Sequence, residues 1–170
     1  EYPIMKHLKK FLAVALVCVM ALAVLTGCGK STKDYQKELS GKLTSANIGV
    51  TTDDNLNKGA ELIVKAVSNV VSDYLKGKNI DIDKIIEDTA KKANLPDDTK
   101  AAFSISGWGQ IVNEGFDGNE STSTKPASDF FVDELKSYNA SHTEKLTKVG
   151  VAVYKIPATG IDVVILIATK

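Results

Sequence analysis

The sequence contains no arginine, since all 21 basic residues are lysine. Arginine is the usual side chain for a two-pronged grip on carboxylate or phosphate, so its absence disfavours recognition of such anions. The lysines are balanced by 21 acidic residues and form no basic cluster. A nucleic-acid partner would require a basic patch, and we expect none.

Cysteine is almost absent as well, with one residue at position 18 and one at position 28. Because no cysteine follows residue 28, the rest of the chain cannot form an internal disulfide. The folded part must therefore be held together by packing, and its length is enough for one domain with a real core.

The first 27 residues have the pattern of an export signal. Three lysines lie within residues 6–10, and an apolar run of 15 residues follows from Phe11 to Leu25. A helix that spans a bilayer needs about 20 apolar residues, so the run is short for an uncleaved anchor. We therefore predict a cleaved signal peptide over residues 1–27. Residues 1–4 precede Met5, do not look like the native start, and are left out of the fold prediction.

The end of this segment, Leu25-Thr26-Gly27-Cys28, resembles the lipobox of bacterial lipoproteins. In that family the cysteine receives acyl chains such as palmitate and becomes the new N-terminus. The alternative is an ordinary thiol beside a standard signal-peptidase site. The resemblance implies a lipid anchor on Cys28, and two acyl chains are enough for stable attachment. It also implies an extracytoplasmic location at the bacterial cell membrane or cell surface. We predict that residues 28–34 form the lipidated cysteine and a polar tether, and that residues 35–170 form one domain.

Apolar periodicity predicts four helices in that domain. The clearest has Asp53-Asp54 as its N-terminal cap and ends at Lys76-Gly77. The others are expected over residues 35–43, from Asp81 or Asp83 to about residue 93, and from Pro126 to about residue 138.

Strands are predicted over residues 103–106, continuing past the glycines into 110–112, and over 149–156 and 161–168. Residues 117–125 are expected to be a surface loop. The last strand is apolar on both faces, which indicates cover on both faces. We therefore predict an α/β fold, a three-layer α-β-α sandwich with helices covering a small, mainly antiparallel sheet. A two-layer α+β fold is the alternative.

The order of elements resembles the CAP domain (cysteine-rich secretory, antigen 5 and pathogenesis-related proteins). The resemblance rests on three stretches between about residues 43 and 168. They are Asp54-Asn55-Leu56 leading into Ala60, Ser141-His142-x-x-x-Leu146, and Val149-Gly150-Val151-Ala152-Val153 before a final apolar strand. The family fold is itself an α-β-α sandwich. Bacterial members are often exported or lipid-anchored.

Many CAP domains have a cleft with two histidines and two acidic residues that can hold a divalent metal. The resemblance implies that His142 matches the second histidine and that Glu114 matches one glutamate. The other histidine has no counterpart, because His142 is the only histidine after the leader. We therefore predict a CAP-like domain without a metal site or cofactor.

Two further features are candidate sites. Trp108, between Gly107 and Gly109, is a candidate platform for stacking a ligand, although a core tryptophan is the commoner meaning of this pattern. Ser141-His142-x-Glu144 contains the residue types of a catalytic triad, but neighbours in sequence rarely direct their side chains at one another. We expect a non-catalytic binding or envelope role, with an extracellular protein or a small apolar ligand as partner. The alternative is a divergent metal-dependent or hydrolytic enzyme that uses His142 and Glu114.

Overall fold

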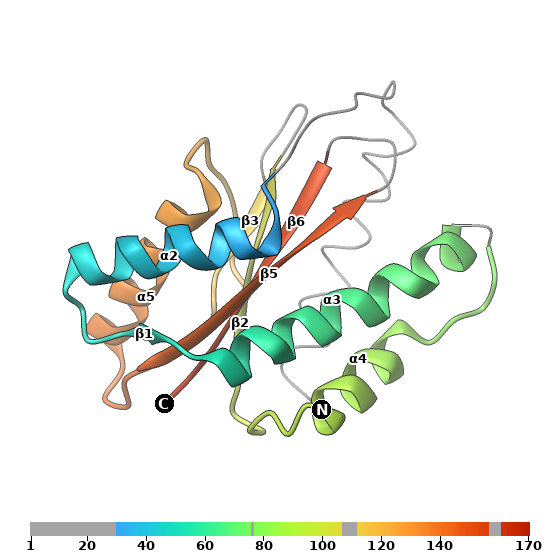
Figure 1. Cartoon of the computed structure of the whole chain (residues 1–170), viewed down its shortest axis with the longest axis horizontal. Coiled ribbons are helices and arrows are strands. Elements are labelled where there is room, and N and C mark those ends of the chain that lie inside the picture. The colour runs from blue at the N-terminus through green and yellow to red at the C-terminus, as the bar shows by residue number, and fades with distance from the viewer. Residues whose placement is uncertain (1–29, 76, 107–111, 157–160) are drawn as a thin grey trace.

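The computed structural model describes residues 30–75, 77–106, 112–156 and 161–170. These residues form four helices and six strands (Figure 1). In chain order, the elements are α2 (Thr32–Ala46), β1 (Thr51–Thr52), α3 (Asp54–Leu75), α4 (Ile82–Lys92), β2 (Lys100–Ser106), β3 (Val112–Glu114), β4 (Glu120–Thr122), α5 (Ala127–Ser141), β5 (Lys148–Ile156) and β6 (Ile161–Thr169).

The strands form one sheet in the order β1-β5-β6-β2-β3-β4. Every neighbouring pair is antiparallel except β1 and β5, which are parallel over two residues. The hairpin of β5 and β6 pairs along its whole length, from Lys148 opposite Thr169 to Ile156 opposite Ile161. The expected pair of C-terminal strands is confirmed. The turn between them, residues 157–160, lies outside the described residues.

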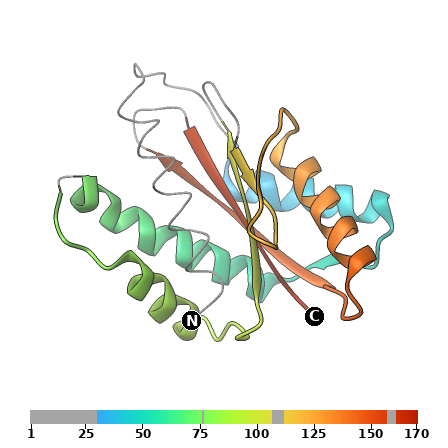
Figure 2. The same cartoon turned by 180° about the vertical axis from the view of Figure 1, so that it is seen from behind.

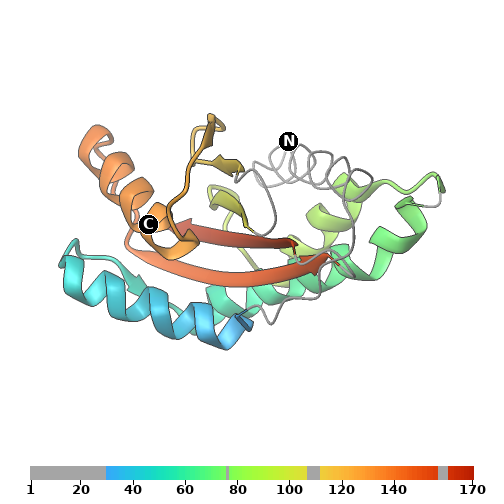
Figure 3. The same ribbon diagram turned by 90° about the horizontal axis from the view of Figure 1, so that it is seen from above.

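Helices cover both faces of the sheet. In Figure 1, α2 and α5 lie to one side of the long strands, and α3 and α4 lie to the other. The same separation is seen from behind (Figure 2). From above, α2 and α5 lie toward one end of the long strands and α3 and α4 toward the other (Figure 3). The predicted α/β sandwich with three layers is therefore confirmed, and the two-layer alternative is not what the chain adopts.

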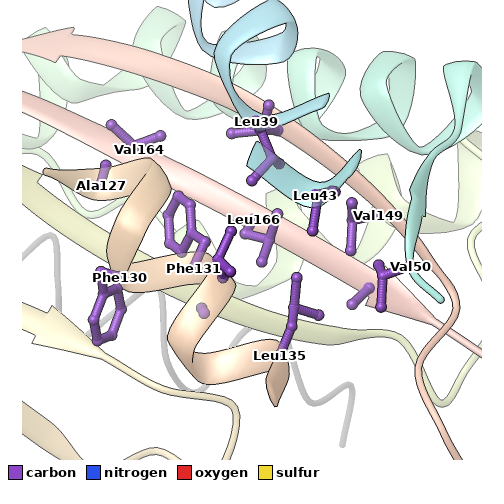
Figure 4. Close-up of a cluster of buried hydrophobic side chains, with 14 of the residues drawn as sticks. Leu39, Leu43, Val50, Ala127, Phe130, Phe131, Leu135, Val149, Val164 and Leu166 are labelled. Carbon is purple, nitrogen blue, oxygen red and sulfur yellow. The ribbon is translucent and has the colours of Figure 1, made fainter. Parts of the chain in front are cut away.

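The strand β6 explains why two helical layers are needed, because alternate side chains of β6 enter two separate cores. Val164, Leu166 and Ala168 pack with α2 and α5. Val163, Ile165 and Ile167 pack with α3 and α4. All six are at most 1 % exposed. Figure 4 shows the first core. Phe131 and Leu135 of α5 and Leu39 and Leu43 of α2 pack in it against the same face of β6.

The second core depends on a very close approach of α3 to β5. A Cβ atom added to Gly150 would lie 2.2 Å from the backbone carbon of Leu56 and 2.4 Å from the backbone nitrogen of Asn57. Only a residue without a side chain fits between this strand and the first turn of the helix. The cap of α3 is as predicted, with Asp53 Oδ1 accepting from the Leu56 N–H at 3.0 Å.

The first helix is longer than predicted at both ends, and this shortens the expected tether. It begins at Thr32 because Ser31 and Asp34 form a capping box, each side chain accepting from the other's backbone N–H. It also continues through Gly41 to Ala46. Gly41 has open space around it, and Leu39 and Leu43 on either side are buried, so packing outweighs the low helix propensity of glycine.

The middle of the chain differs from the prediction in two places. The strand expected to run on into residues 110–112 instead reverses, because β3 pairs antiparallel with β2. The surface loop expected over residues 117–125 contains β4, paired with β3 through Glu120, Ser121 and Thr122. These strands of three residues are too short for an alternation of apolar and polar residues to be recognised.

Side chains complete the hydrogen bonds of β5 where β1 ends. Asn57 Oδ1 accepts from the Val151 N–H at 3.0 Å, and Thr32 Oγ1 accepts from the Val153 N–H at 3.2 Å. Gln36 Nε2 donates to the Val151 carbonyl at 3.4 Å. Three polar side chains from α2 and α3 thus occupy positions that a neighbouring strand would take, which protects this part of the sheet edge.

Candidate functional site

Two of the sequence-predicted site residues, Cys28 and Trp108, lie outside the described residues. The same is true of residues 1–27, the predicted signal peptide. The structure can be compared with the prediction only for Glu114 and His142.

Glu114 is the last residue of β3 and is fully buried. It lies directly opposite Phe103 of β2. Residues directly opposite in neighbouring strands point to the same face of a sheet. Phe103 belongs to the core beneath α3 and α4, so the side chain of Glu114 is on that face.

His142 is the residue that ends α5, on the other side of the sheet. Its ring stacks on Tyr138, with centroids 3.7 Å apart and planes 6° from parallel. Its Nδ1 lies 2.9 Å from the Tyr138 carbonyl oxygen, which also accepts the backbone N–H of His142 at 3.0 Å. His142 therefore acts as the C-terminal cap of α5.

These positions do not bring Glu114 and His142 together. Glu114 and His142 lie on opposite faces of the sheet. Ser141 Oγ does lie 3.0 Å from His142 Nδ1, contrary to the expectation for neighbours in sequence. The same hydroxyl is also within hydrogen-bond distance of two helix carbonyl oxygens, at 3.1 and 3.2 Å, and Glu144 pairs with Lys170 rather than with the histidine, so the three residues do not form a catalytic triad. Within the described ranges, no three His, Cys, Asp or Glu side chains come together in a way that could hold a metal ion.

One groove of about 810 Å³ lies between α2 and α5. Three lysines and three acids line this groove, and four of them form two ion pairs. Lys42 Nζ is 2.7 Å from Asp129 Oδ1, and Lys125 pairs with Asp133. Because the opposite charges are matched within the groove, it offers no net charge to a charged ligand.

A second groove, of about 640 Å³, follows the part of β5 that β1 does not cover, and we call it the edge groove. It lies between the start of α2 and the middle of α3. Its lining residues are Ser31, Thr32, Lys33, Glu61, Val64, Lys65, Ala152, Val153, Tyr154 and Lys155. Apolar side chains at this site are flanked by three lysines, so the groove suits a ligand or surface with both apolar and anionic parts.

Tyr154 is the one lining residue whose acid–base behaviour is strongly altered. It is 4 % exposed, and its hydroxyl has no hydrogen-bond partner among the described residues. Burial raises the pKa of Tyr154 from 10.0 to about 12, because the charged phenolate would lose its hydration.

This shift predicts alkaline destabilisation that the variant Tyr154→Phe lacks. The folded state holds the proton more tightly than the unfolded state, so this contribution to stability is complete below pH 10 and is lost as the pH rises through 12. The loss is on the order of 2 kcal/mol. Urea unfolding of both proteins at a series of alkaline pH values measures it. Titration of the lysines in ion pairs affects both proteins alike. If the free energy of unfolding fell equally steeply with pH in both proteins, the prediction would be contradicted.

Comparison with protein-family models, curated proteins and solved structures gave no match.

The edge groove was not anticipated, and one sequence signal could have indicated it. Ser31-Thr32-Lys33-Asp34 has the spacing of a capping box, which places the start of a helix at Thr32. That start brings Thr32 and Lys33 to β5. The contributions of Lys65 and Tyr154 depend on packing between distant segments, for which the sequence holds no local signal.

Proposed function

We propose that the protein is a lipid-anchored lipoprotein of the bacterial cell envelope. The observation that carries this proposal is the sequence Leu25-Thr26-Gly27-Cys28 at the end of an apolar run of 15 residues. Acyl chains on Cys28 would hold the domain at a membrane surface without a polypeptide span. None of the helices in the described parts of the chain has the length and apolar character that a membrane span requires.

We propose a non-catalytic role for the domain, binding an extracellular protein or a small apolar ligand, or contributing to envelope structure. Two findings support this. The candidate residues Glu114 and His142 lie on opposite faces of the sheet, and His142 ends a helix. The apolar side chains of the edge groove, Val64 and Val153 among them, offer contacts to such a partner.

We also propose that the domain is a divergent CAP domain. Support comes from helices on both faces of a mainly antiparallel sheet and from the turn at Ser141-His142 that leads into the final hairpin.

Incorporation of a labelled fatty acid by bacterial cells that express the full chain tests the lipid anchor. We expect label in the wild-type protein and in Cys18→Ala, since Cys18 is removed with the leader. Cys28→Ala should incorporate none. The two variants are matched, because each removes one of the two cysteines. An unlabelled wild-type protein, or label retained in Cys28→Ala, would refute the proposal.

A further inference from the structure

The distance between Cys28 and the folded domain is very short. Ser31 already caps α2, so only Gly29 and Lys30 separate it from Cys28. A chain spans at most about 3.6 Å per residue, so Ser31 lies within about 11 Å of Cys28. The inference below rests on the proposed lipid anchor, which would bring the start of α2 close to the membrane.

The start of α2 is firmly attached to one end of the sheet. Thr32 receives a hydrogen bond from Val153 of β5, and Gln36 donates to both Val151 and Glu61 of α3. Tyr35 is 7 % exposed within the core. Because these contacts fix the helix, its start cannot swing away from the end of β5. Figure 1 shows the blue start of α2 near the end of the sheet where β5 ends and β6 begins.

The surface at this end is the edge groove with its lysines. Among the described residues, Lys33 and Lys65 have no ion-pair partner, whereas Lys155 is 3.2 Å from Asp162. The acid nearest to them in the lining, Glu61, accepts a hydrogen bond from Gln36. Lysines near an anionic membrane surface are attracted to its headgroups.

We infer that the domain rests on the membrane through the edge groove, with Lys33 and Lys65 against the headgroups of anionic phospholipids. The strands then lead away from the surface. Lys148, at the start of β5, is paired with Thr169 at the far end of the hairpin. Lys148 is seven positions along β5 from Lys155 of the edge groove, which is a distance of about 23 Å in a strand. The end of α5 and Lys170 lie at this distal end and face outward.

Site-specific fluorescence quenching tests this orientation. In the mature protein Cys28 would be acylated and no other cysteine follows it, so one introduced cysteine can be labelled uniquely. The lipidated full-length protein is placed in vesicles of phosphatidylethanolamine and phosphatidylglycerol that carry a quencher on the lipid headgroup. Lys33→Cys and Lys65→Cys report on the groove. Lys92→Cys, an exposed lysine at the end of α4, and Glu144→Cys are the distal controls.

We expect several-fold stronger quenching at positions 33 and 65 than at 92 and 144. The double variant Lys33→Glu/Lys65→Glu, labelled at Lys155→Cys, should be quenched less than the same label on the wild-type background. Equal quenching at all positions in protein that floats with the vesicles would overturn the orientation but leave the anchor intact. Protein that does not float with the vesicles would overturn both.

Discussion

Replacement of Leu166 by Asp should leave the domain unfolded at neutral pH. Leu166 is fully buried in the middle of the sheet, opposite Ala102 and Val151, beneath α2 and α5. Both strand neighbours are apolar, so a carboxylate at this position would be buried without a partner. Such a charge costs several kcal/mol, against a total stability of about 5–15 kcal/mol for a typical domain.

Leu166→Ala separates the effect of charge from the effect of lost volume. The cavity alone should cost about 2–5 kcal/mol, so this variant should fold with a lower unfolding midpoint. Circular dichroism with urea titration measures both variants. The Asp variant should also regain structure in mild acid, because burial raises the pKa of the introduced carboxyl and favours its neutral form. Equal stability of the two variants at neutral pH would show that position 166 is not sealed from water.

Gly150→Ala should destabilise the domain by about 3 kcal/mol, the upper part of the range for overpacking. The added methyl group would lie 2.2–2.4 Å from backbone atoms of Leu56 and Asn57, and helix backbone cannot rotate aside as a side chain can. The first turn of α3 would have to move away from β5. That movement would also strain the hydrogen bond from the Val151 N–H to Asn57.

Gly41→Ala is the matched control, since it adds the same methyl group in open space within α2. Alanine is the better helix former, so this variant should be more stable by about 0.5–1 kcal/mol. Chemical unfolding of both variants gives the comparison. The free energy of unfolding should therefore fall in Gly150→Ala and rise in Gly41→Ala. A loss of stability in both would show that the surroundings of Gly41 are not open, and no loss at Gly150 would contradict the close approach of α3.

The long elements were predictable because their patterns are long. The apolar stripe and Asp53 cap of α3 span six turns, and the unbroken apolar run of β6 implied both helical layers. The shorter features were not predictable. β1 has two residues, and β3 and β4 have three each. Their existence depends on partners that are distant in sequence rather than on any local periodicity.

The candidate site was also hard to predict, because the positions of its residues depend on contacts between distant parts of the sequence. The alignment of His142 with a CAP histidine used its neighbours in sequence, but the opposite faces of Glu114 and His142 follow from strand register. Likewise, Asn57 looks like any polar residue in the first turn of a helix. Asn57 is 8 % exposed, and its side chain accepts a hydrogen bond from Val151, which lies 94 residues later in β5. No local pattern in the sequence indicates this contact.

Mass spectrometry of the mature amino terminus tests the lipid anchor most directly. Trypsin cleaves after lysine, so the mature protein should give the fragment Cys28-Gly29-Lys30, with a mass increased by a glycerol-linked pair of acyl chains or by three chains. An unmodified Cys28 fragment would contradict the account. So would a fragment from Phe11 to Lys30, which would show that the leader had stayed in place.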